Sequence, residues 1–144
     1  MTGCVFCEIV AGQAPASFVY RDDRVTAFLV NRPVTPGHLL VIPNDHLETM
    51  ADLDDGLLSD ITRVGARMAS ALRASGLPCE GINLFLADGE AAGQEVFHAH
   101  LHVFPRTPGD GFTIGATAWA GPQPDREALD AIAGAIARAA AESV

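Results

Sequence analysis

The chain contains no lysine, and all nine of its basic residues are arginines. Without a lysine amine the protein cannot form a Schiff base with a carbonyl substrate, nor supply the lysine of a phosphate-binding P-loop. Nine arginines stand against 18 acidic residues, which gives a formal net charge of −9. Such an acidic chain repels a phosphate backbone at long range, so we expect no nucleic-acid partner. The charge is still compatible with a small anionic ligand held by local hydrogen-bond donors.

Long apolar runs are also missing. No stretch approaches the roughly 20 consecutive apolar residues of a spanning helix, so we expect no membrane partner. The first ten residues carry no positive charge, which argues against a secretory signal. The three cysteines, Cys4, Cys7 and Cys79, are an odd number for a disulfide framework. Together these features predict a cytoplasmic protein.

The 144 residues are 49% hydrophobic and 19% charged, which is the composition of a globular protein. This length is ordinary for one domain and long enough to bury a sizeable core. We therefore expect a single domain over residues 1–144, with its core at about 4–106 and a tail and helix at 107–144.

Apolar periodicity predicts the secondary structure. One set of apolar residues recurs every three or four positions and indicates a helix face: Leu57, Ile61, Val64, Met68 and Leu72. A last helix is indicated by similar spacing at Leu129, Ile132 and Ile136. Four apolar runs are typical of strands: 25–30, 38–42, 81–87 and 97–104. We therefore predict an α+β fold, with an antiparallel sheet of about five strands, one long helix and a C-terminal helix.

Residues 97–103 alternate histidine with apolar residues. On a strand, successive side chains point to opposite faces, so the apolar residues, Phe97 among them, would share a core face. His98, His100 and His102 would share the other face. Three interpretations are open at this point: a solvated polar face, a metal site of three histidines, and nucleophilic catalysis by one histidine with two helpers.

Several motifs together resemble the histidine triad (HIT) family. The family's defining pattern alternates histidine with hydrophobic residues and ends in two further hydrophobic residues, as the segment from His98 to Phe104 does. The other motifs precede it: Pro36-Gly37-His38, Ile42-Pro43 with His46 after it, and Ala92-Gly93-Gln94. The resemblance covers about residues 4–106 and implies a HIT-like fold.

The resemblance implies covalent chemistry at the α-phosphate of a purine nucleotide. His100, the central histidine, would be the nucleophile and form a nucleotidyl-histidine that water then cleaves, while His102 would donate to the phosphate or the leaving group. The implied substrates are nucleotide conjugates such as phosphoramidates and dinucleoside polyphosphates, and a homodimer is expected. The implied nucleotide-binding residues are His38 and Gln94 at the phosphate, Asn31 at the ribose, and Phe6, Ile9 and Phe28 around the base.

The Cys4-x-x-Cys7 pair is a moderate zinc signal by itself. Bacterial HIT proteins that this chain resembles bind zinc through a cysteine pair, a distant histidine and the first triad histidine, which implies Cys4, Cys7, His46 and His98 here. A site closed by four protein ligands has no open position, so this zinc would be structural. The alternative is that both cysteines stay reduced and metal-free.

Two positions depart from the family's usual pattern. Glu95 stands where many relatives have serine or threonine, and Ala87 stands where relatives often have asparagine or glutamine reaching towards phosphate. Three other functions therefore stay open: a nucleotide-binding interaction protein with little turnover, a nucleotidyltransferase or phosphorylase, and a metalloenzyme that holds one metal on all three triad histidines. The last of these predicts a metal that survives the loss of Cys4 and Cys7.

Overall fold

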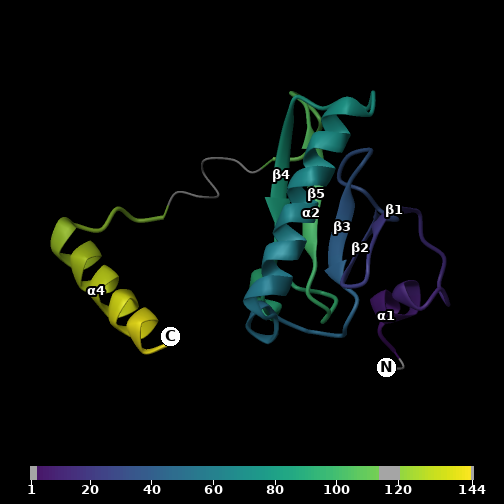
Figure 1. Cartoon of the computed structure of the whole chain (residues 1–144). Helices are drawn as coiled ribbons and strands as arrows, with labels where there is room; N and C mark the ends of the chain where they lie inside the picture. The colour runs from purple at the N-terminus through teal and green to yellow at the C-terminus, as the bar shows by residue number, and fades with distance from the viewer. Residues whose placement is uncertain (1–2, 114–120, 144) are drawn as a thin grey trace. The chain divides into compact units, whose positions relative to one another are not determined.

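The computed structural model describes residues 3–113 and 121–143. Its contacts divide the chain into two compact units, Met1–Gly111 and Phe112–Val144. All of the site residues expected from the sequence fall in the first unit, which holds the sheet (Figure 1). Within the described residues, no helix is both long enough and apolar enough to cross a membrane.

The first unit is built on a five-stranded antiparallel sheet with the strand order β1-β2-β3-β5-β4. This confirms the α+β class and the antiparallel sheet expected from the sequence. The strands are β1 Phe18–Arg21, β2 Val25–Leu29, β3 Leu39–Pro43, β4 Gly81–Phe85 and β5 Leu101–Arg106. Because β3 and β5 are neighbours, residues far apart in the sequence meet in the middle of the sheet.

The long helix α2, Asp55–Ala74, packs against β3 and β5 (Figure 1). The side chain of Asp54 caps its first turn by accepting a hydrogen bond from the backbone N–H of Leu57. Gly65 allows the helix to approach β5, since a Cβ there would lie 2.8 Å from Leu101 Cδ2. The main core combines sheet and helix residues: Val25, Ala27, Leu39, Val41 and Val103 with Leu57, Ile61, Val64, Ala69 and Leu72.

A second apolar cluster covers the opposite face of the sheet. It includes the alternate residues of β3, Leu40 and Ile42, which point away from the main core because strand side chains alternate. The short helix α1, Val5–Val10, contributes Phe6 and Ile9 to this cluster. There are two 3-10 turns in the described connections. Met50–Asp52 precedes α2, and Glu90–Ala92 follows β4.

The strand expected over 97–104 begins only at Leu101 and runs to Arg106. Before it, the backbone N–H of Ala99 donates to the Leu47 carbonyl, at 2.7 Å, so this segment bonds to a loop rather than to β3. Phe97, expected on a core face, is 42% exposed. The prediction that all three triad histidines extend from one strand is therefore wrong for His98 and His100, which precede the strand.

The strand expected over 81–87 ends early for a related reason. Phe85 pairs with His102, close to the start of β5, so residues 86–87 have no strand beside them to pair with.

The second unit contains helix α4, Arg126–Glu142, which confirms the expected C-terminal helix. Asp125 caps it by accepting a hydrogen bond from the backbone N–H of Ala128. Its apolar residues Leu129, Ile132 and Ile136 are exposed.

Candidate functional site

Three histidine rings pack together where β3 and β5 lie side by side. His38 immediately precedes β3, His100 immediately precedes β5, and His102 is the second residue of β5. The ring centroids of His38 and His102 are 5.1 Å apart, and those of His100 and His102 are 5.0 Å apart. The structure thus brings together the three residues that the sequence assigns to phosphate chemistry.

Hydrogen bonds determine which ring nitrogen of His38 and His102 carries a proton. The backbone N–H of Val34 donates to Nδ1 of His38, at 3.1 Å, so the proton of a neutral His38 lies on Nε2. That Nε2 lies 2.9 Å from Nδ1 of His102 and donates to it. The proton of His102 then lies on its own Nε2, which is the nitrogen left to donate to a ligand.

The tautomer of His100 is fixed in the opposite sense. Its Nδ1 donates to the backbone carbonyl of His98, at 2.7 Å, so its Nε2 carries an unprotonated lone pair. The residue is buried, and burial lowers its pKa. A neutral imidazole with a fixed, free Nε2 is the form of histidine that acts as a nucleophile.

The pKa values of the other two rings agree with these tautomers. Burial, and then the neighbouring His100 and His38, lower the pKa of His102 to about 4. Burial also lowers the pKa of His38. Both rings are therefore neutral at pH 7.

We expect the protein to lose stability as the pH falls from about 6.5 to about 4. The unfolded chain protonates His102 near pH 6.5, its ordinary value, whereas the folded chain protonates it only near pH 4. The unfolded state binds more protons in this window, so the free energy of unfolding falls as the pH falls. With allowance for solvent screening, we expect His102 to contribute roughly 2 kcal/mol.

Urea unfolding at pH 7 and pH 4.5 measures this effect. The parent should lose more stability between the two pH values than His102→Gln does, because the variant lacks the titrating ring. Equal losses in both proteins would contradict the assignment.

A second group of donor atoms gathers beside the triad. Among the described residues, one ligand atom from each of Cys4, Cys7, His46 and His98 lies within 4.8 Å of the others. The sulfur-to-Nδ1 separations are 3.5 Å for Cys4 and His98, 3.3 Å for Cys7 and His46, and 3.6 Å for Cys7 and His98. A tetrahedral zinc with ordinary bond lengths places sulfur and nitrogen ligands about 3.6 Å apart, so the four residues fit zinc.

The protonation of this group also suits a metal. His98 is fully buried, and its Nε2 donates to the Pro43 carbonyl at 2.8 Å, which leaves Nδ1 unprotonated and facing both sulfurs. A backbone acceptor on the far nitrogen is the usual companion of a metal-binding histidine. Burial, together with the adjacent Cys4, raises the pKa of the Cys7 thiol. A bound cation would offset this effect and favour the thiolate.

The residues predicted for the base and ribose line one pocket of about 300 Å³. Phe6 and Ile9 come from α1, Phe28 from β2, and Asn31 from the turn after β2. After that prediction, we call this the nucleoside pocket. It adjoins the histidine cluster, because the ring centroid of Phe6 lies 5.2 Å from that of His100. The rest of its wall is mostly apolar, with one cation: Val5, Pro15, Ala16, Leu29, Val30, Leu40 and Arg32.

Gln94, predicted to contact phosphate, is buried and fully hydrogen-bonded to backbone. Its Oε1 accepts from the N–H of Gly89, and its Nε2 donates to the carbonyls of Glu48 and Val96. In this arrangement the side chain ties the loop before the triad to the segment after β3. Its contact with phosphate stays a prediction.

The sequence patterns did not indicate which backbone groups orient the histidines. These are the N–H of Val34 and the carbonyls of Pro43 and His98. Every residue type except proline carries the same N–H, and every type carries the same carbonyl, so no residue signal could have identified them.

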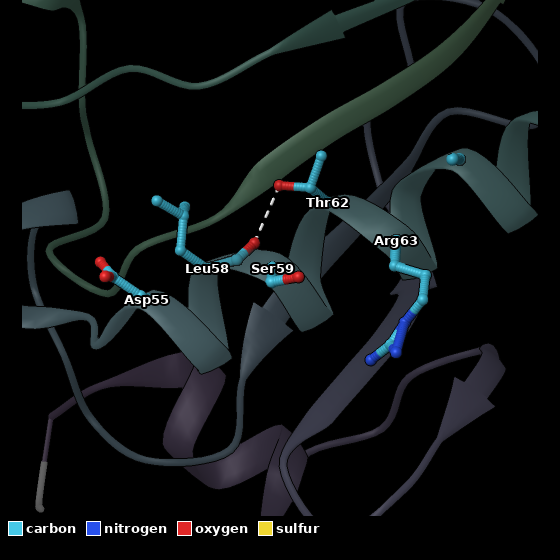
Figure 2. A pocket seen from close by; sticks show the side chains of 6 residues that line it. Asp55, Leu58, Ser59, Thr62 and Arg63 are labelled. Atoms are coloured by element: carbon cyan, nitrogen blue, oxygen red, sulfur yellow. Dashed lines mark hydrogen bonds between the residues drawn. The ribbon is translucent and has the colours of Figure 1, made fainter.

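A larger hollow of about 600 Å³ lies on the surface of α2, away from any of these side chains (Figure 2). It is lined by residues of that helix alone: Asp55, Leu58, Ser59, Thr62, Arg63 and Ala66. The hydroxyl of Thr62 donates to the Leu58 carbonyl within the helix (Figure 2). This lining holds no histidine or cysteine, so the histidine cluster remains the candidate site.

Comparison with known sequences identifies relatives over most of the chain. The HIT domain family model matches residues 11–109. An uncharacterized HIT-like protein of Mycobacterium tuberculosis is 42% identical over 129 residues, which cover 90% of this chain and 89% of that protein. The adenylylsulfatase HINT3 of Arabidopsis thaliana is 33% identical over 108 residues, which cover 74% of this chain and 54% of that protein.

Solved structures of HIT proteins share the fold. A HIT family protein from Bacillus anthracis, 41% identical, matches with a TM-score of 0.86 over 96% of this chain and 97% of its own. A zinc-bound histidine triad family protein from Mycobacterium smegmatis, 44% identical, gives 0.74 over 87% and 86%. A histidine triad nucleotide-binding protein from Candida albicans, 27% identical, gives 0.86 over 99% and 100%. The chain therefore belongs to the histidine triad (HIT) family.

Proposed function

We propose that this protein is a nucleotide-binding hydrolase that cleaves at the α-phosphate of purine nucleotide conjugates, with His100 as the nucleophile. The observation that carries the proposal is the fixed tautomer of His100. Its Nδ1–H is held by the His98 carbonyl at 2.7 Å, so Nε2 keeps a free lone pair at neutral pH.

The reaction takes two displacement steps. In the first, the Nε2 lone pair of His100 attacks the α-phosphorus and forms a P–N bond, while the bond to the leaving group breaks and its electron pair goes to the leaving group. In the second, water attacks the same phosphorus, and the electron pair of the P–N bond returns to Nε2. The products are a nucleoside monophosphate and the protonated leaving group. Overall, water supplies the hydroxyl group that remains on the phosphate and the proton that the leaving group takes up.

We propose that His102 assists both steps. Its Nδ1 accepts from His38, so its Nε2–H is the donor available to a phosphate oxygen or to the leaving atom. A donor already oriented towards developing negative charge needs no reorganisation during the reaction. The low pKa of His102 means that it starts as a neutral donor and becomes cationic only next to an anionic group.

The nucleoside pocket and the relatives support the proposed substrate class. An apolar pocket of about 300 Å³ that ends at His100 suits a purine base with its α-phosphate at the nucleophile. The similar proteins include one named an adenylylsulfatase and one named a nucleotide-binding protein. Phosphoramidates, dinucleoside polyphosphates and nucleotidyl sulfates present the same α-phosphate, and we propose this group as substrates.

We further propose that Cys4, Cys7, His46 and His98 hold a zinc ion. The spacing of the four donors and the zinc-bound relative support this assignment. When bound, a zinc with four protein ligands supplies structural constraint and no open position for substrate. None of Cys4, Cys7 and Cys79 forms a disulfide in the described structure, which suits a reducing compartment, and we propose that the protein is cytoplasmic.

We propose that two copies associate along β4. This strand ends the sheet, and its residues Leu84 and Phe85 are 47% and 49% exposed. An unpaired edge with apolar side chains is a pairing surface. Sedimentation velocity should give twice the chain mass of 15.1 kDa, and Leu84→Lys should shift the protein towards the monomer. A monomeric parent at micromolar concentration would contradict the proposal.

Intact-protein mass spectrometry after brief mixing with an adenosine 5′-phosphoramidate tests the hydrolase. The parent should gain the mass of one adenylyl group transiently and release AMP. AMP binding without adduct or turnover would instead support an interaction protein. Delivery of the adenylyl group to an added acceptor, in preference to water, would support a nucleotidyltransferase or phosphorylase.

A further inference from the structure

Phe6 belongs both to the helix of the metal donors and to the nucleoside pocket. It lies between Cys4 and Cys7 in the sequence, and it is 7% exposed. Its ring centroid is 5.6 Å from that of Phe28, 5.8 Å from that of His98 and 5.2 Å from that of His100. One ring therefore contacts the base pocket, a metal-site histidine and the proposed nucleophile.

Helix α1 has few intrinsic sources of stability. It has six residues, and isolated helices shorter than about 12–15 residues are marginal in water. Its N-cap residue is Cys4, which makes no side-chain capping bond. The position of α1 therefore depends on the packing of Phe6 and Ile9 and on the bonds that the two cysteine sulfurs make.

The metal donors would join α1 to two distant segments. His46 follows β3 and His98 precedes β5, and their Nδ1 atoms lie 3.3 to 3.6 Å from the cysteine sulfurs. A metal bound by all four residues would fix α1 against both segments. It would thereby fix the wall of the nucleoside pocket that α1 supplies through Val5, Phe6 and Ile9.

We propose that zinc binding at the four-residue site and nucleotide binding in the nucleoside pocket reinforce each other, with Phe6 as the positioning residue that couples them. This inference rests on the proposed function, since it takes the nucleoside pocket to be where a nucleotide binds. When the metal has already ordered α1, a nucleotide that contacts the α1 wall no longer has to order it. By thermodynamic reciprocity, the nucleotide raises the zinc affinity by the same factor.

Isothermal titration of the full chain with AMP, in its zinc-loaded and metal-free forms, tests the coupling. We expect zinc to lower the Kd for AMP about tenfold, within the usual range of coupling between two sites. A competition titration with a chromogenic zinc chelator should show the zinc Kd falling by the same factor at saturating AMP. The two factors must agree, because both titrations measure the same coupling free energy.

Phe6→Ala is the decisive variant, because it keeps all four metal donors. It should bind one zinc, but its AMP affinity should no longer depend on zinc. Val10→Ala is the matched control: Val10 is another apolar residue of α1, and it does not line the nucleoside pocket. It should retain the full coupling.

The outcomes separate the inference from the function on which it rests. If AMP binds neither the zinc-loaded nor the metal-free protein, the proposed function and the coupling are both wrong. If AMP binds equally well with and without zinc, only the coupling is wrong. Coupling that persists in Phe6→Ala would show that α1 transmits it by another residue and would overturn the role of Phe6.

Discussion

Replacement of His100 by alanine should lower kcat for an adenosine phosphoramidate by at least about four powers of ten, because it removes the only group proposed to form the covalent bond. AMP binding should change much less, since the nucleoside pocket is made by other side chains. The adenylyl adduct should disappear from the mass spectrum. Single-turnover kinetics with titration of AMP would separate the loss of chemistry from any loss of binding.

Two controls make this result specific to the nucleophile. His102→Ala removes a donor but not the attacking nitrogen, so we expect a loss of about two to three powers of ten, with the adduct still formed. Phe97→Ala changes an exposed side chain directly beside the triad and should be nearly silent. An adduct in His100→Ala, or a fall in rate that merely follows a fall in thermal stability, would argue against His100 as the nucleophile.

The elements that the sequence predicts well are those with a strong local signal. The spacing from Leu57 to Leu72 identifies α2, because a helix that buries one face must repeat its apolar residues at this period. The alternation of the triad is correct from Leu101 onwards, where β5 pairs with β3 and β4. The strand order was not predicted from the sequence, because periodicity carries no information on which strands are neighbours. The meeting of His38 with His102 was expected only through the resemblance to the family.

The elements that the sequence does not single out lack such a signal. Helix α1 is six residues long, too short to show a period, and it is held by packing and by its cysteines. Strand β1 has mostly exposed residues, so it shows no apolar alternation. The segment from Phe97 to His100 looks like a strand in its pattern, yet Ala99 bonds to the Leu47 carbonyl instead. Tertiary hydrogen bonds decided the conformation against the local pattern.

The candidate site shows the same division. The histidine pattern and the resemblance to the family pointed to the histidines and to four candidate metal donors, whereas backbone geometry decides which ring nitrogen each histidine offers. His98 illustrates both, since its ring faces the cysteines and its carbonyl accepts from His100. A change in how the His98 ring is held therefore acts directly on the nitrogen proposed to attack phosphorus.

Loss of the metal donors should lower the stability of this protein strongly. The four donors close loops of 39 to 94 residues, so a bound zinc restricts the unfolded chain strongly and binds only the folded one. At a free zinc concentration a thousandfold above Kd, the stabilisation is about 4 kcal/mol. For a domain of this size we expect Cys4→Ser with Cys7→Ser to lower Tm by roughly 12 °C.

Differential scanning calorimetry, with metal content measured by atomic emission, checks this prediction. Cys79→Ser is the matched control, because that thiol lies outside the metal cluster. It packs at the edge of the main core and donates to the Gly81 carbonyl at 3.5 Å, a hydrogen bond that a serine hydroxyl can also make. The parent and Cys79→Ser should each carry one zinc per chain and have the same Tm, while the double variant should carry no zinc.

If the double variant kept its zinc, the metal would have to bind to other residues, which is the outcome expected of a metalloenzyme with all three triad histidines on one ion. That arrangement would need the His98 ring to leave the cysteines and the free Nε2 of His100 to bind the metal instead of attacking phosphorus, so retained zinc would overturn the structural metal site and the proposed nucleophile together.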